Sequence, residues 1–87
     1  MAGITVQQRD GLPDIAAVVL TWQDPTGNRQ ATIHLRRDPA RSGRIHIILP
    51  SVWGIDADLA RVYGEALIRA ASVAEHLEKG TGELPYT

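Results

Sequence analysis

The first half of the chain alternates between apolar and polar residues with a period of two, which is the pattern of half-buried β-strands. Ile4 and Val6 alternate with Thr5 and Gln7, and the later runs RQATIHLR and RIHIIL repeat the pattern. Turn-forming residues, among them the sequence DPTGN, separate these runs. The predicted strands span residues 4–9, 15–23, 29–36 and 44–49.

The same alternation predicts which side chains share a face and how neighbouring strands pair. A four-residue loop over residues 25–28 pairs Asp24 with Arg29, and the next hairpin places Arg36 opposite Arg44. Both registers bring apolar side chains together on one face of the sheet. The core-facing residues expected from the two middle strands are Val18, Leu20, Trp22, Ala31, Ile33 and Leu35.

The second half of the chain contains one long amphipathic helix, predicted over residues 56–79. Asp56 is a suitable N-cap, and Asp58 in the first turn suits the positive end of the helix. Apolar residues recur every three or four positions and form the stripe expected to face the core: Leu59, Val62, Tyr63, Ala66, Ala70, Val73 and Leu77. Gly64 belongs to a second stripe of small residues, with Ala60, Ala71 and Ala74, which indicates close approach by the sheet or by a second helix.

These elements predict an α+β fold in the order β-β-β-β-α. A four-stranded antiparallel sheet over residues 4–49 carries the helix on one face, and residues 81–87 form a loose tail. A length of 87 residues corresponds to a single domain. Because one helix covers only one face of a sheet, the other face is expected to stay open.

The open face is the expected recognition surface. In the predicted register His34 lies opposite His46 on this face, and Val19 and Ile48 are apolar side chains among polar ones. An apolar patch with a polar rim marks interaction sites on many proteins.

Composition narrows the classes of function. Hydrophobic residues make up 44% of the chain and charged residues 22%, which is typical of a globular domain. The chain has no cysteine, which excludes disulfides, thiolate zinc sites and a cysteine nucleophile. No signal peptide and no membrane-spanning apolar run is visible, so we expect a cytoplasmic protein that does not bind membranes.

Charge is distributed unevenly although the formal net charge is −1. Residues 29–46 contain five arginines and one aspartate, whereas residues 56–83 contain six acidic and three basic residues. Such asymmetry bears on partners rather than on fold, unless the arginines simply keep the hairpin soluble. The residues predicted to bind a partner are Arg36, Arg41, Arg44, His34 and His46, with Val19 and Ile48 as apolar anchors.

Sequence motifs for catalysis are missing. None of the serines lies in a G-x-S-x-G elbow, and the chain has neither a P-loop nor a dinucleotide fingerprint. His34 and His46 would together supply only half of a zinc site, which needs three or four ligands. We therefore expect a non-enzymatic protein with no catalytic residue, cofactor or metal ion.

Three kinds of partner remain open. A protein partner is favoured because arginine is enriched at interfaces and lysine is not, and this chain has eight arginines and one lysine. A nucleic acid is the alternative, because arginines on a sheet can read a major groove, although an isoelectric point near 6.2 is low for such domains. A homodimer through the open face or an edge strand is the third.

The sequence WGIDADLA, followed by an alanine-rich helix, resembles small phage and prophage proteins in which a β-meander precedes such a helix. The matching residues are Asp56, Ala57, Asp58, Leu59, Ala60, Ala66, Leu67, Ala70 and Ala71. The resemblance covers the last third of the chain. Some proteins of this build, anti-CRISPR proteins among them, dock onto a host complex without chemistry. The resemblance thus implies an inhibitor that acts by occlusion and has no catalytic residues.

Overall fold

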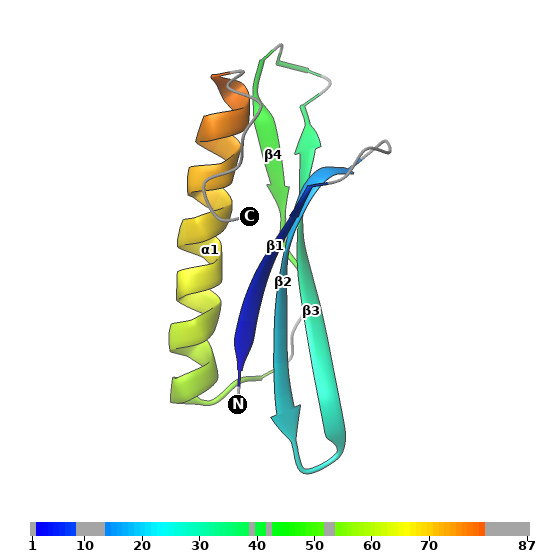
Figure 1. Cartoon of the computed structure of the whole chain (residues 1–87), viewed down its shortest axis with the longest axis vertical. Coiled ribbons are helices and arrows are strands. Elements are labelled where there is room, and N and C mark those ends of the chain that lie inside the picture. The colour runs from blue at the N-terminus through cyan, green and yellow to red at the C-terminus, as the bar shows by residue number, and fades with distance from the viewer. Residues whose placement is uncertain (1, 9–13, 39, 42, 52–53, 80–87) are drawn as a thin grey trace.

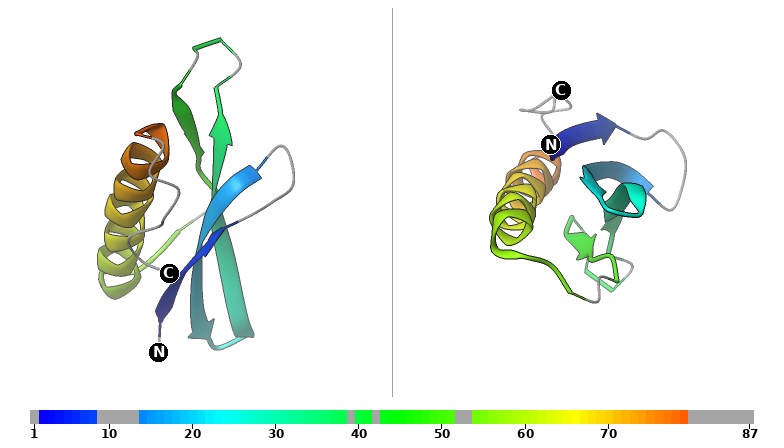
Figure 2. Two further views of the ribbon diagram at one scale, coloured as in Figure 1. Left: turned by 45° about the horizontal axis from the view of Figure 1, so that its top comes forward. Right: turned by 90° about the horizontal axis from the view of Figure 1, so that it is seen from below.

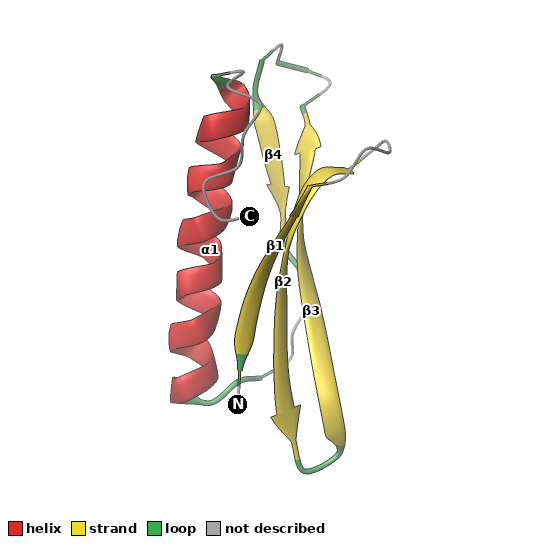
Figure 3. Ribbon diagram, viewed as in Figure 1, coloured by secondary structure: helices red, strands yellow, loops and turns green. Residues whose placement is uncertain are grey.

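The protein forms a four-stranded antiparallel sheet with one long helix lying along it (Figure 1). This computed structural model describes residues 2–8, 14–38, 40–41, 43–51 and 54–79. The elements are β1 (Gly3–Gln8), β2 (Asp14–Asp24), β3 (Gly27–Arg37), β4 (Ile45–Ile48) and α1 (Ala57–Glu78), as Figure 3 shows. The predicted α+β fold and element order are confirmed, and the predicted tail, 81–87, lies outside the described residues.

Strands that follow one another in the sequence are neighbours in the sheet, in the order β1-β2-β3-β4. β2 and β3 have eleven residues each and form a long ribbon, whereas β4 has four residues and pairs only with the last part of β3. In Figure 1, β4 lies beside the upper part of β3, and the chain then runs down to the start of α1 at the other end. The lower part of β3 is therefore left without β4 beside it.

The core lies between α1 and one face of the sheet, and Figure 2 shows the helix on one side of the strands. The buried cluster consists of Val6, Ala16, Val18, Ile33, Leu35, Ile45, Ala66, Ala70, Val73 and Ala74. The helix contributes mainly alanine to this cluster, which lets its backbone approach the strands closely. Of the predicted core residues in β2 and β3, all are buried except Trp22, which is half-buried.

The helix begins where the sequence predicts, but its first turns pack less tightly than expected. The Asp56 side chain caps it, because its Oδ1 accepts a hydrogen bond from Leu59 N at 2.8 Å. Leu59 and Val62 from the predicted stripe are only half-buried. A hollow of about 580 Å³ separates these turns from Trp22 near the β2–β3 turn.

No other part of the described chain lies close to Gly64, so the predicted close approach at this residue is wrong. A methyl group added to its Cα would meet no described atom within 4 Å outside the adjoining backbone of its own helix. We expect Gly64→Ala to raise the free energy of unfolding by about 0.5–1 kcal/mol, because alanine favours helix more than glycine does. Urea unfolding followed by circular dichroism tests this, and the reverse change at exposed Ala60, Ala60→Gly, should destabilise by a similar amount. A Gly64→Ala variant less stable than wild type would contradict the prediction.

The turn between β2 and β3 is shorter than predicted, so the register differs by two residues. Asp24 pairs with Gly27 instead of Arg29, which leaves only Pro25 and Thr26 in the turn. Asp24 Oδ1 accepts hydrogen bonds from Thr26 N at 2.8 Å and Thr26 Oγ1 at 2.5 Å, which close the turn. Gly27 has a φ of 126°, which other residues rarely adopt. A shift of two residues keeps each side chain on its predicted face, so the hydrophobic pattern fits both registers.

The register between β3 and β4 also differs by two residues from the prediction. Arg36 pairs with His46 and not with Arg44. Arg44 lies level with Asp38, because Asp38 N donates a hydrogen bond to Arg44 O at 3.0 Å. The observed register avoids two directly opposed guanidinium groups, which would repel each other.

Candidate binding surface

The face of the sheet turned away from α1 carries several of the predicted binding residues. Ala17 of β2 lies between Gln7 of β1 and His34 of β3, and His34 pairs in turn with Ile48 of β4. The predicted pairing of His34 with His46 is therefore wrong, because the register differs by two residues. Ile48 is 36% exposed and remains a candidate anchor on this face.

Val19, the other predicted apolar anchor, offers little surface to a partner. It lies in β2 between Thr5 of β1 and Thr32 of β3, and it is only 6% exposed. The flanking strands shield it, which a residue count along one strand does not reveal. A partner approaching this face would meet Ile48 rather than Val19.

A β-bulge in β2 brings an unpredicted carboxylate to the open face. Ala16 pairs with Leu35, but Asp14 pairs with Arg36, so Ile15 is the extra residue of the bulge. The bulge lets Ile15 pack against the core while Asp14 contacts residues of the open face. Nothing in the sequence marks a bulge at this position, so Asp14 was not among the residues predicted for the open face.

Asp14 bridges two of the predicted binding residues. Its Oδ2 lies 2.7 Å from His34 Nδ1, and its Oδ1 accepts a hydrogen bond from Arg36 Nε at 2.5 Å. The hydrogen bond from Arg36 is the main cause that lowers the pKa of Asp14 below its usual range. Partial desolvation of the carboxyl opposes this shift, and the interactions with His34 add to it. The ionised carboxylate therefore fixes both side chains on the face.

We expect the fold to lose stability in acid as Asp14 takes up a proton. The pKa of Asp14 is lower in the folded chain than in the unfolded chain, where a carboxyl of this type has a pKa of about 3.9. Ionised Asp14 therefore stabilises the fold fully at pH values above its pKa in the unfolded chain. This stabilisation is lost as the pH falls through its pKa in the folded chain. The free energy of unfolding, measured in urea at a series of pH values, should fall below about pH 4. The fall should be shallower for Asp14→Asn, and an equally steep fall would contradict the prediction.

The Arg36→Gln variant tests the cause of this low pKa. Without the guanidinium, the pKa of Asp14 should rise toward its usual range, as measured by NMR titration of the carboxyl carbon. Arg37→Gln is the matched control, because the exposed Arg37 side chain has no ion-pair partner among the described residues. A pKa of Asp14 that stays equally low in Arg36→Gln would rule out the proposed cause.

Asp38 holds the second histidine and the loop between β3 and β4. Its Oδ2 lies 3.0 Å from His46 Nε2, and its Oδ1 accepts a hydrogen bond from Ala40 N at 2.8 Å. The Asp38 side chain is buried, whereas His46 is exposed. His34 and His46 thus each contact their own carboxylate and do not form a shared site.

Carboxylates offset most of the arginines. The ion pairs are Arg29–Asp24, Arg36–Asp14, Arg44–Glu78, Arg61–Asp58 and Arg69–Glu65. Arg44 reaches Glu78 at the end of α1, 3.9 Å away, so the helix predicted to be acidic neutralises part of the basic hairpin. Among the described residues, Arg37 and Arg41 are the arginines without a carboxylate partner. The charge asymmetry along the sequence is therefore largely compensated in three dimensions.

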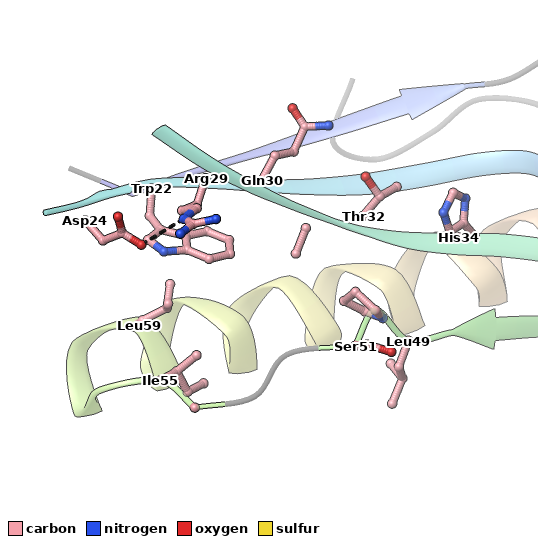
Figure 4. Close-up of a pocket in the computed structure, with 13 residues that line it drawn as sticks. Trp22, Asp24, Arg29, Gln30, Thr32, His34, Leu49, Ser51, Ile55 and Leu59 are labelled. Carbon is pink, nitrogen blue, oxygen red and sulfur yellow. Dashed lines mark hydrogen bonds and ion pairs between the residues drawn. The ribbon is translucent and has the colours of Figure 1, made fainter. Parts of the chain in front are cut away.

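A groove of about 650 Å³, which we call the β3-edge groove, lies along the part of β3 that β4 leaves uncovered (Figure 4). β4 pairs only with residues 34–37, so no described strand pairs with Gly27–Ile33 on that side. Leu49 and Ile55 from the β4–α1 connection and Leu59 from α1 also line the groove. Sequence analysis missed it because it depends on the early end of β4.

The described residues form neither a metal-ligand cluster nor a complete catalytic triad. Their histidine and acidic side chains form no group of three or more that could hold a metal ion. Asp14 and His34 resemble the carboxylate and imidazole of a catalytic triad, but no described serine or threonine hydroxyl hydrogen-bonds to that ring.

The comparisons with known proteins found no relative whose function could be carried over to this chain. No helix in the described residues combines the length and the apolar character needed to cross a membrane. No protein-family model, curated protein or solved structure matches the chain. The resemblance to phage proteins therefore stays a prediction.

Proposed function

We propose that this protein is a non-enzymatic, cytoplasmic protein-binding domain whose partner docks on the sheet face turned away from α1. The exposure of Ile48 on this face is the main observation in support of the proposal. Ile48 is an exposed isoleucine on that face, it pairs with His34, and it follows His46 by two residues on the same side of β4. An apolar side chain among arginine and histidine is a favoured composition at protein interfaces.

The polar residues around Ile48 are held in place before a partner arrives. Asp14 fixes His34 and Arg36, and Asp38 fixes His46. Side chains that are already ordered lose less entropy on binding, so more of the contact energy appears as affinity. Arg41, in the loop beside this surface, has no described carboxylate partner and is available to an acidic group of the partner.

The same observations weaken the case for a nucleic acid. Phosphate binding depends on cations that are not already neutralised, and in the basic hairpin Arg29, Arg36 and Arg44 have carboxylate partners. Single-stranded nucleic acids also stack on aromatic side chains, whereas the described tryptophan, Trp22, lines the β3-edge groove and the hollow beside the first turns of α1. An inhibitor that occludes a host complex is a specific case of the protein-binding proposal and needs no chemistry beyond docking.

Affinity capture from the cells that produce the protein, with quantitative mass spectrometry, tests the proposal. Ile48→Ser should reduce recovery of the main partner by roughly tenfold, as expected for a central interface side chain. Ile68→Ser is the matched control, because Ile68 is an exposed isoleucine on α1, far from the open face in the fold. Undiminished capture by Ile48→Ser, or binding of random duplex DNA that falls steeply with salt, would contradict the proposal.

A further inference from the structure

The uncovered edge of β3 is a second surface, which adjoins the open face at His34. β4 ends at Ile48, opposite His34, so the seven residues Gly27–Ile33 have a strand neighbour on the β2 side only among the described residues. The β3-edge groove lies beside this segment (Figure 4). Unpaired backbone N–H and C=O groups at a sheet edge are a template for pairing with another chain.

The segment Gly27–Ile33 itself lacks the sequence features that usually prevent pairing between chains. Gly27–Ile33 contains neither proline nor lysine, and the observed bulge lies elsewhere, at Ile15. Its one charged side chain, Arg29, is neutralised by Asp24 through a contact of 3.0 Å. Edge strands of this length normally carry such features, so their absence from this described segment favours pairing with another chain.

We propose that Gly27–Ile33 pairs antiparallel with the same segment of a second copy of this chain, so that the two sheets join into one sheet of eight strands. When the two seven-residue segments overlap completely, the two-fold axis of the dimer passes at their middle residue, Gln30. This inference does not depend on the proposed function, because it concerns the sheet edge and not the open face.

The resulting register opposes compatible side chains. Gln30 meets Gln30 of the second copy, Asn28 meets Thr32, and Arg29 meets the small Ala31. No like charges are directly opposed. The side-chain amides of Asn28 and Gln30 and the hydroxyl of Thr32, on the open face, come within hydrogen-bonding distance of their counterparts. Charge and shape therefore favour a second copy as the occupant.

The second copy would also continue the path of β4. Both β4 and the incoming strand run antiparallel to β3, and the incoming Gly27 reaches Ile33 just where β4 ends opposite His34. The β2–β3 turn of the second copy then abuts the chain at Leu49, which is 57% exposed in the single copy. Leu49 and Ile55, two of the four exposed large apolar residues in the described part of the chain, lie in the β4–α1 connection and line the groove.

The pairing is short, so the dimer should be weak. Seven residues of strand span roughly 23 Å, and interfaces at the low end of the size range are typically transient. A dimer would place two open faces side by side on one continuous sheet. A partner with two matching sites would then bind the dimer more tightly than it binds a single copy of the chain.

Sedimentation equilibrium of the full chain, from micromolar to millimolar concentration, tests the proposal. Wild type should show a monomer–dimer equilibrium. Gln30→Lys and Gln30→Glu should each weaken dimerisation by about tenfold or more, because each places two like charges together on the axis. An equal mixture of the two variants should restore the dimer, which shows that neither has simply misfolded. Gln23→Lys, an exposed glutamine on β2 away from the edge, is the matched control.

A wild-type chain that stays monomeric at millimolar concentration would overturn the dimer and leave the protein-binding proposal standing. A dimer that is unaffected by both Gln30 variants would also overturn it, because the contact would then lie elsewhere. Loss of partner capture in Ile48→Ser remains the separate readout for the proposed function.

Discussion

Leu35→Ala should lower the free energy of unfolding by about 2–5 kcal/mol. Leu35 is fully buried, with Ala16 and Ile47 opposite it on the neighbouring strands, and it belongs to the cluster beneath α1. Truncation removes apolar contacts and leaves a cavity that the surrounding side chains fill only in part. Because small domains are stable by only about 5–15 kcal/mol, this variant should unfold at a much lower urea concentration, as followed by circular dichroism.

Leu49→Ala is the control for this prediction, because it removes the same atoms from a side chain that is largely exposed. Its free energy of unfolding should lie within about 0.5 kcal/mol of wild type. Equal losses in the two variants would show that burial of Leu35 is not what stabilises the sheet.

Ala70→Leu should lower the free energy of unfolding by about 1–3 kcal/mol through overpacking. Ala70 is fully buried where α1 packs on the sheet, and Val73 and Ala74 of the next turn are buried beside it. A leucine at this position must either displace the helix or adopt a strained rotamer, because protein interiors are close-packed.

Ala71→Leu provides a neighbouring site for comparison, since Ala71 is exposed on the same helix. This variant should unfold at the wild-type urea concentration. If Ala70→Leu were as stable as wild type, the close contact between helix and sheet would be wrong.

The assignment of side chains to faces could be predicted from the sequence, but strand register could not. Val18, Ile33 and Leu35 are buried on the helix side as the alternation predicts. Both hairpins nevertheless differ by two residues from the predicted pairing. The apolar pattern repeats every two residues, so it fits several registers equally well. The Asp24 side chain in one turn and charge repulsion between Arg36 and Arg44 in the other favour the observed registers.

The composition of the candidate surface depended on contacts between distant residues. Arg36, His34 and Ile48 could be placed on the open face from sequence alone. Asp14 could not, because it reaches that face through a bulge and lies 20 residues from His34 in the chain. The shielding of Val19 likewise results from neighbours on two other strands.

The sequence by itself determined the order of the elements, the capped amphipathic helix and the two faces of the sheet. Each of these follows from the local periodicity of apolar residues and from side chains that hydrogen-bond to backbone groups a few residues away. Only the tertiary structure decided the registers, the carboxylate partners of the arginines and the uncovered edge of β3. Those features arise where segments far apart in the chain meet. They are stabilised by contacts between two segments, so neither segment's sequence predicts them alone.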